Sequence, residues 1–132
     1  MIGIDTNILV RYITRDDPAQ WRIAHAIITR RLTREQPGWI SAVVLIETIW
    51  VLRRTYRYPA EAVLGAVRLL LNASTLAVEA EREVNDALSD AQRLNVDFAD
   101  ALIAALAHRA GCAVTLTFDT RAARIPGFQL AT

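Results

Sequence analysis

Short apolar segments alternate with longer helical segments along this chain, and this alternation restricts the possible folds more than any other feature. The apolar segments are residues 2–4, 39–40, 76–78, 114–118 and 128–130. Between them, apolar residues recur at helical spacing, as in the stretch that carries Trp21, Ala24, Ile28 and Leu32. Strands that alternate with helices predict an α/β fold with a mainly parallel sheet of about five short strands.

Composition and length limit the chain to a few classes of protein. With 132 residues, of which 53% are hydrophobic and 22% charged, we expect a single globular domain over residues 1–132. No apolar run is long enough for a membrane span, and the first residues resemble a core strand rather than a signal peptide. We therefore expect no membrane contact and a cytoplasmic protein. A lone cysteine, Cys112, cannot form an internal disulfide and is expected in the core.

The basic residues exclude several mechanisms. Lysine and arginine together number 15, and every one of them is an arginine. The chain therefore lacks the lysine that a P-loop, a receiver-domain phosphorylation site or Schiff-base chemistry requires. The net charge of +1 alone neither favours nor excludes a nucleic-acid partner.

Two aspartates come directly after apolar strands. Asp5 follows residues 2–4, and Asp119 ends residues 114–118. In parallel sheets, functional sites lie at the carboxyl ends of strands, near the point where the strand order reverses. Each aspartate has a structural alternative, because Asp5 is also a good helix N-cap and Asp119 a good turn or cap residue.

Three further acids lie on predicted helices. Glu47 shares a helix face with Val43 and Trp50, where a buried unpaired charge is costly. It either lies at the edge of the apolar stripe, pairs with an arginine such as Arg54, or binds a metal ion. Asp97 and Asp100 open the helix over residues 97–109. Asp97 is the better cap, whereas Asp100, one turn into the helix, can project toward a site.

Together these acids predict a site for a divalent metal ion. Four carboxylates cannot all stay ionised at close range without a cation, and Mg²⁺ or Mn²⁺ suits oxygen ligands that also receive a phosphate. The chemistry that this favours is phosphodiester hydrolysis by an activated water. His25 and His108 have no partners at zinc-site spacing, and no dinucleotide, P-loop or serine-hydrolase motif occurs.

Four motifs in order along the chain resemble the PIN-domain family. They are residues 4–10 (IDTNILV), 41–47 (SAVVLIE), 97–104 (DFADALIA) and 117–119 (TFD). Each is unspecific alone, but the series covers nearly the whole chain. The short length resembles the VapC-type ribonuclease toxins of toxin–antitoxin pairs rather than larger members of the family.

The resemblance implies a fold and a set of site residues. The fold is a three-layer α/β/α sandwich with strand order 3-2-1-4-5. The catalytic residues that match the family's acidic quartet are Asp5, Glu47, Asp100 and Asp119. The positions that match metal ligands are Asp5 and Asp100, with Asp119 completing the site. Supporting positions are Thr6, Asn7 and Asp97.

The resemblance also implies partners. We expect an Mg²⁺- or Mn²⁺-dependent ribonuclease that forms a homodimer and binds a VapB-type antitoxin. An RNA substrate agrees with the charge outside the quartet, because the other ten of the 14 acids are outnumbered by the 15 arginines. Two alternatives remain: a PIN-domain RNA-processing nuclease without an antitoxin, and an inactive RNA-binding or dimerisation module. The arginine clusters at 30, 31 and 34 and at 53, 54 and 57 are either phosphate-binding or solvated surface.

Overall fold

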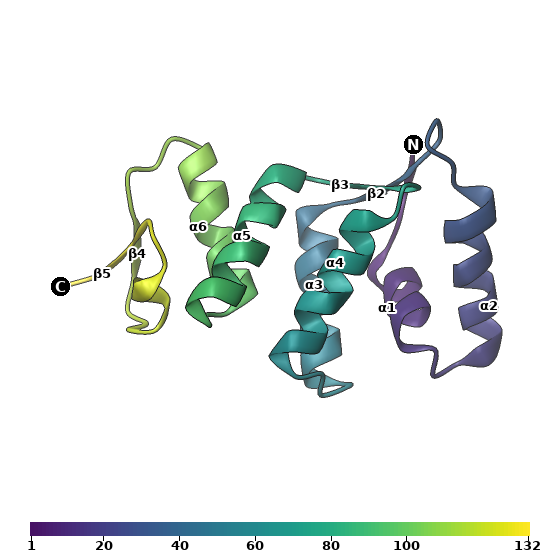
Figure 1. Ribbon diagram of the computed structural model, residues 1–132, viewed down its shortest axis with the longest axis horizontal. Coiled ribbons are helices and arrows are strands. Elements are labelled where there is room, and N and C mark those ends of the chain that lie inside the picture. Colours follow the sequence, from purple (N-terminus) through teal and green to yellow (C-terminus); the bar gives the residue numbers. More distant parts are fainter. The chain divides into compact units, whose positions relative to one another are not determined.

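Six α-helices and five short strands alternate along the chain in the computed structural model, which describes residues 1–132 (Figure 1). They form two compact units, Met1–Glu79 and Ala80–Thr132, which are called here the N-terminal unit and the C-terminal unit. None of the helices combines the length and the apolar character that crossing a bilayer requires.

The sheet of the N-terminal unit has three parallel strands, which are β1 (Ile2–Gly3), β2 (Gly38–Ile40) and β3 (Leu76–Val78), in the order β1-β2-β3. Gly38 pairs with both Ile2 and Leu76. A Cβ atom at Gly38 would lie 2.6 Å from Leu32 Cδ1 and 2.8 Å from Ile4 Cγ1. The central strand therefore begins with glycine because the core side chains around it leave no room for a larger residue.

Four helices complete the N-terminal unit, and three of them begin at a residue whose side chain caps the helix. They are α1 (Thr6–Thr14), α2 (Pro18–Ala26), α3 (Ala42–Arg54) and α4 (Ala60–Asn72). Asp5, Asp17 and Ser41 each accept a backbone N–H of the helix that follows. A π-helical turn, η1 (Ile27–Arg31), continues α2. Between the elements lies a fully buried core, which includes Leu9, Leu32, Ile40, Leu45, Leu52 and Leu70.

The C-terminal unit is built on a helix pair and two strands. The helices α5 (Glu81–Leu94) and α6 (Phe98–Arg109) run side by side (Figure 1). They are followed by the parallel strands β4 (Thr115–Thr117) and β5 (Phe128–Leu130), with the short 3₁₀-helix η2 (Ala122–Arg124) between them. Gly111, with φ +96°, ends α6 in the left-handed conformation that the sequence predicts. The core consists of residues such as Val84, Leu88, Phe98, Leu102 and Ile125.

The α/β class and every predicted strand and helix are confirmed. The five strands form two parallel sheets, and the orders β1-β2-β3 and β4-β5 are the two halves of the expected order 3-2-1-4-5. The adjacency of β1 and β4 stays a prediction. The placement of Cys112 in the core is wrong, because this residue lies in the exposed connection after α6. The small, apolar side chain of a cysteine is therefore not sufficient to predict that the residue is buried.

Candidate acidic active site

Asp5 follows β1 and is also the N-cap of α1. Its Oδ1 accepts the backbone N–H of Thr6 at 2.8 Å, and its Oδ2 makes no hydrogen bond. The structural and functional interpretations of Asp5 are therefore compatible, because one oxygen caps the helix and the other remains available to a ligand.

Glu47 lies on an exposed face of α3, which corrects the expectation of a buried charge. The residues of α3 that face the core are Leu45, Thr48, Ile49 and Leu52. Val43 and Trp50, which share the face of Glu47, are 76% and 54% exposed. Because α3 is apolar nearly all round, its sequence does not identify the buried face. Pairing with Arg54 is also wrong, since the Arg54 guanidinium stacks on Trp50, 4.0 Å from the ring centroid.

Asp5 and Glu47 line the same cavity of the N-terminal unit, which has a volume of about 300 Å³. Thr6 and Asn7 also line it, so four of the predicted site residues come together here. Thr6 is only 6% exposed, and its hydroxyl oxygen has no hydrogen-bond partner. A buried hydroxyl is normally hydrogen-bonded, so a water or another oxygen-containing group in the cavity would satisfy it. The remaining lining residues are Val10, Arg11, Val51, Thr55 and Tyr56.

Two lining residues, Arg11 and Tyr56, were not predicted as site residues. The Arg11 guanidinium donates to Asp16 Oδ1 at 2.9 Å and to the Tyr56 hydroxyl at 3.2 Å. Tyr56 in turn donates to Asp16 Oδ2 at 2.7 Å. For Arg11 the sequence offers one signal, which is that Arg11 lies one helical turn beyond the predicted site residue Asn7 on α1. For Tyr56 the sequence gives no such signal, since its partners are 40 and 45 residues away.

The C-terminal unit groups Asp97, Asp100 and Asp119. Asp97 caps α6 as predicted, accepting the N–H groups of Ala99 at 2.8 Å and Asp100 at 3.3 Å. Asp119 follows β4, and its Oδ1 accepts two backbone N–H groups at the start of η2, at 2.8 and 3.2 Å. Its Oδ2 makes no hydrogen bond. The capping alternative for Asp119 is therefore correct, and it leaves one oxygen available.

Asp100 is the half-buried member of this group. Burial of the carboxyl raises its pKa above the ordinary value, and the negative charges of Asp97 and Asp119 raise it further. The three aspartates are thus close enough to repel one another. A cation near them would relieve that repulsion.

The donors in both units suit a hard divalent cation. Carboxylate, hydroxyl and amide oxygens are the ligands of Mg²⁺ and Mn²⁺, and neither group contains a histidine or cysteine ligand. Within either unit, no three acidic, histidine or cysteine side chains gather as a ready-made metal site. The unpartnered Thr6 hydroxyl and the raised pKa of Asp100 nevertheless fit a cation with its waters.

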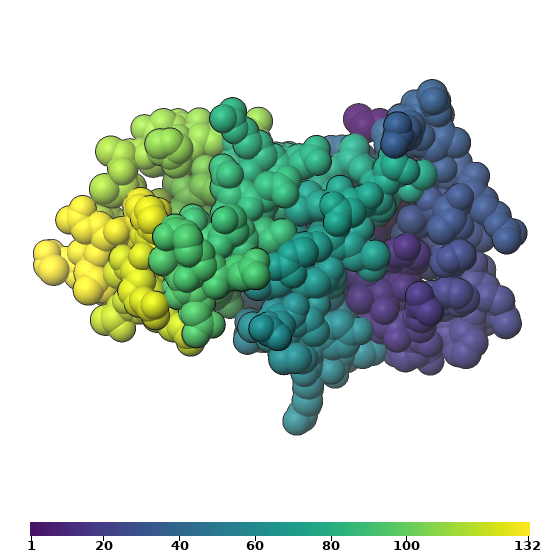
Figure 2. All heavy atoms as spheres, in the orientation of Figure 1, coloured from purple at the N-terminus to yellow at the C-terminus, as the bar shows by residue number.

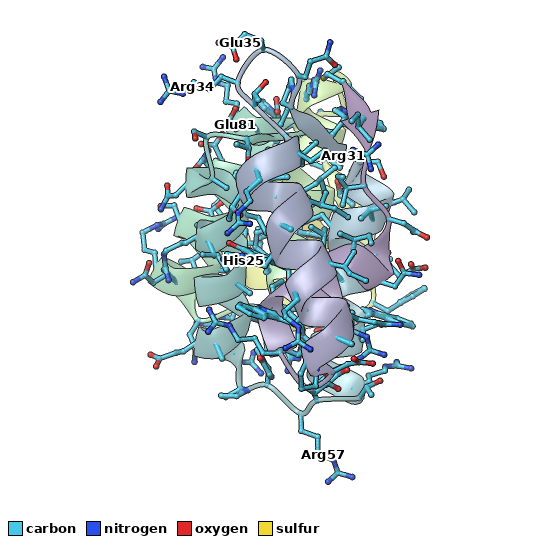
Figure 3. The ribbon with its side chains drawn as sticks, turned by 90° about the vertical axis from the view of Figure 1, so that its right-hand side faces the viewer. His25, Arg31, Arg34, Glu35, Arg57 and Glu81 are labelled. Atoms are coloured by element: carbon cyan, nitrogen blue, oxygen red, sulfur yellow. The ribbon has the colours of Figure 1, made fainter.

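Two of the three arginines of the first predicted cluster, Arg30 and Arg31, line the same surface hollow. A shallow hollow of about 560 Å³ on α2 and η1 is lined by Arg22, Ile23, Ala26, Ile27, Arg30 and Arg31. Arg22, which was not predicted as part of the cluster, lines the same hollow as Arg30 and Arg31. Arg34 points in a different direction from Arg31 (Figure 3).

The second cluster does not form one surface. Arg54 is stacked on Trp50, whereas Arg57 projects from the connection between α3 and α4 (Figure 3). The same connection, in teal, stands out from the body of the N-terminal unit in Figure 2. Arg57 has a positive φ of 55°, which fits a turn. A contiguous phosphate-binding patch at 53, 54 and 57 is therefore not supported.

Comparison with known proteins gives one family. The PIN domain family matches residues 2–127, which include all seven predicted site residues and both units. No curated protein matches the chain. PIN domains are generally nucleases that use divalent metal ions, so the match supports a hydrolase with a nucleic-acid substrate. The match extends over nearly the entire sequence, and the chain therefore belongs to the PIN domain family.

Proposed function

We propose that this protein is an Mg²⁺- or Mn²⁺-dependent ribonuclease and the VapC-type toxin of a toxin–antitoxin pair. The observation that carries the nuclease proposal is the cavity in which Asp5 and Glu47 meet the unpartnered hydroxyl of Thr6. The family match supports it, because PIN domains are generally nucleases. The toxin assignment is supported by the resemblance of the four motifs.

The proposed active site unites the two groups of acids. Asp5, Glu47, Asp100 and Asp119 would form one quartet in a single domain over residues 1–132. The supporting argument is that Asp5 and Asp119 each follow a parallel strand, and that such strand ends meet where the strand order reverses. The strand order 3-2-1-4-5, with β1 beside β4, provides this arrangement.

Each residue has a definite role in hydrolysis. Asp5, Asp100 and Asp119 would hold the divalent ion, whose charge lowers the pKa of a water and offsets the negative charge of the phosphate. Glu47, which has no ion-pair partner, accepts a proton from the attacking water. The water oxygen bonds to phosphorus as the bond to the leaving oxygen breaks, and that oxygen takes up a proton. Thr6 would support Asp5 through its backbone N–H, and Asp97 would support Asp100 by accepting its backbone N–H. Asn7 lines the same cavity as Asp5.

A homodimer, a VapB-type antitoxin and a cytoplasmic location belong to the same proposal. The exposed apolar side chains of α3, Val43 and Trp50, are the kind of surface that protein partners cover. Expression of the protein alone should arrest growth. Co-expression of its cognate antitoxin should restore growth, whereas a processing nuclease would be harmless alone.

The nuclease proposal is tested by digestion of total RNA with the purified protein. We expect cleavage in Mn²⁺ or Mg²⁺, none with a chelator, and a loss of at least about a hundredfold in Asp100→Asn. The matched control is Asp86→Asn, which neutralises an exposed aspartate on α5 and should cut like the wild type. If folded wild-type protein cut no RNA with either metal, the nuclease proposal would be wrong.

A further inference from the structure

The guanidinium of Arg11 is held at one end of the acidic cavity by three neighbours. Its Nε donates to Gln20 Oε1 at 2.6 Å. Its Nη1 donates to Asp16 Oδ1 at 2.9 Å and to the Tyr56 hydroxyl at 3.2 Å. A guanidinium has five N–H donors, so the two on Nη2 remain without a partner. Arg11 is thus fixed in place and still has donors to offer.

The partners of Arg11 are fixed in turn. Asp16 accepts hydrogen bonds from the Tyr56 hydroxyl at 2.7 Å and the Thr14 hydroxyl at 2.9 Å. These bonds lower the pKa of Asp16, and the hydrogen bond to Asp16 raises the pKa of Arg11. The network joins α1, the start of α2 and the segment after α3. A side chain positioned in this way loses little conformational entropy when it binds a ligand.

Stability alone does not explain this network. The Arg11 and Asp16 side chains are 32% and 43% exposed, and ion pairs at that exposure contribute little to folding. The network instead borders the cavity that Asp5, Thr6 and Glu47 line. Along α1, Arg11 lies five residues beyond Thr6, which corresponds to about 7.5 Å of helix rise. The apolar side chains of Val10 and Val51 line the same cavity.

We propose that Arg11 is a substrate-binding residue that holds the RNA phosphate next to the one that is cleaved. This inference rests on the proposed nuclease function and names how that site seats its substrate. A planar guanidinium fork matches the oxygens of a phosphate. The next phosphate along the RNA would then lie beside Asp5 and Glu47 and would be the one that is cleaved. Asp16, Gln20 and Tyr56 act through Arg11 as positioning residues.

The test uses a short RNA oligonucleotide that spans a cleavage site mapped by the total-RNA digestion. Arg11→Met should raise KM about tenfold while kcat stays within about twofold, because the lost contact is made equally before and during the reaction. The matched control is Arg93→Met on α5, which removes an arginine paired with Asp90 at 2.9 Å and should leave KM unchanged.

A second measurement does not depend on how the variant folds. In the wild type, a neutral methylphosphonate at one linkage beside the scissile bond should raise KM to a similar extent. In Arg11→Met the same substitution should add nothing, because two changes to one contact are not additive.

Each outcome separates the inference from the function on which it rests. If the wild type cleaves the oligonucleotide and tolerates a methylphosphonate at every neighbouring linkage, the Arg11 inference is wrong and the nuclease function stands. An unchanged KM in a folded Arg11→Met variant leads to the same conclusion. A wild type that cuts no RNA rejects the proposed function, and the inference with it.

Discussion

The two units of the chain treat their acidic residues differently. In the N-terminal unit, Asp5 and Glu47 face a cavity that also contains a hydroxyl and a fixed arginine. In the C-terminal unit, Asp97, Asp100 and Asp119 have one another as electrostatic neighbours, and burial and repulsion together raise the pKa of Asp100. The first arrangement places acids beside a fixed positive group, whereas the second leaves a carboxyl whose burial and negative neighbours disfavour its ionised form.

This difference suggests how a small nuclease divides its tasks. A phosphate carries negative charge, so acids close to it require both a cation and a separate positive group that fixes the chain of the substrate. Under the proposed function, the acids of the C-terminal unit would be stabilised by the cation, and the N-terminal unit would supply the arginine. The family match includes residues of both units.

The largest expected effect tests whether the two units fold as one domain. Leu52 in the N-terminal unit and Leu102 in the C-terminal unit are 0% and 2% exposed. Leu52→Ala and Leu102→Ala should each lower the free energy of unfolding by about 2–5 kcal/mol. Because we propose a single domain, both variants should shift the same cooperative transition in thermal and denaturant unfolding.

The control for this pair is Ser89→Ala, which changes an exposed residue of α5 and should alter stability by less than about 0.5 kcal/mol. Two separate transitions, with Leu52→Ala moving one and Leu102→Ala moving the other, would contradict the single-domain proposal. The comparison of the units would then concern two independently folding parts.

Local signals made most of the fold predictable from the sequence. Asp5 and Asp97 were identified as caps because a short polar side chain before an apolar helix is suited to that role, and both accept backbone N–H groups of the helix that follows. The strands at 76–78 and 128–130 were also found with their observed bounds. These features depend on neighbours within a few residues, so the sequence displays them directly.

Features that depend on distant contacts were not predictable. The exposed position of Glu47 follows from which face of α3 packs on the core, and an almost wholly apolar helix does not reveal that. The Arg11 network depends on Tyr56, which is 45 residues away. Four of the acids proposed for the site could be predicted nevertheless, because Asp5 and Asp119 follow strands and Asp97 and Asp100 lie at the start of a helix, which are local features.

The next effect in size concerns the charge of the C-terminal group. In the metal-free protein at neutral pH, Asp100→Asn should raise the melting temperature. The raised pKa of Asp100 means that its ionised form is disfavoured in the folded state. The protonated Asp100 carboxyl therefore contributes stability that is fully present below the ordinary aspartate pKa. That stability is lost as the pH rises through the pKa of Asp100 in the folded state. The advantage of Asp100→Asn should accordingly shrink in acid.

Divalent ions should reverse the order of the melting temperatures of the wild type and Asp100→Asn. Mn²⁺ at about a hundred times its Kd should stabilise the wild type by about 2.7 kcal/mol and Asp100→Asn much less. Asp86→Asn, the exposed control on α5, should respond to Mn²⁺ like the wild type. A metal-free Asp100→Asn that melts below the wild type would show that repulsion does not dominate this group.

The smallest expected effect tests the polar network of the N-terminal unit. Tyr56→Phe removes the hydroxyl that donates to Asp16 at 2.7 Å, which is the largest cause of the lowered pKa of Asp16. A lowered carboxyl pKa contributes stability above the ordinary value of about 3.9, and that stability is lost as pH falls through the folded-state value. Tyr56→Phe should therefore melt slightly below the wild type at neutral pH, and the two melting curves should converge in acid.

The control is Tyr58→Phe, which changes a partly buried tyrosine two residues further along and should match the wild type at every pH. An equal loss at every pH would mean that the Tyr56 hydroxyl stabilises the fold without acting through the charge of Asp16. Because the change lies in the network around Arg11, the response to Mn²⁺ should persist, and this separates that network from the acids that we propose bind the cation.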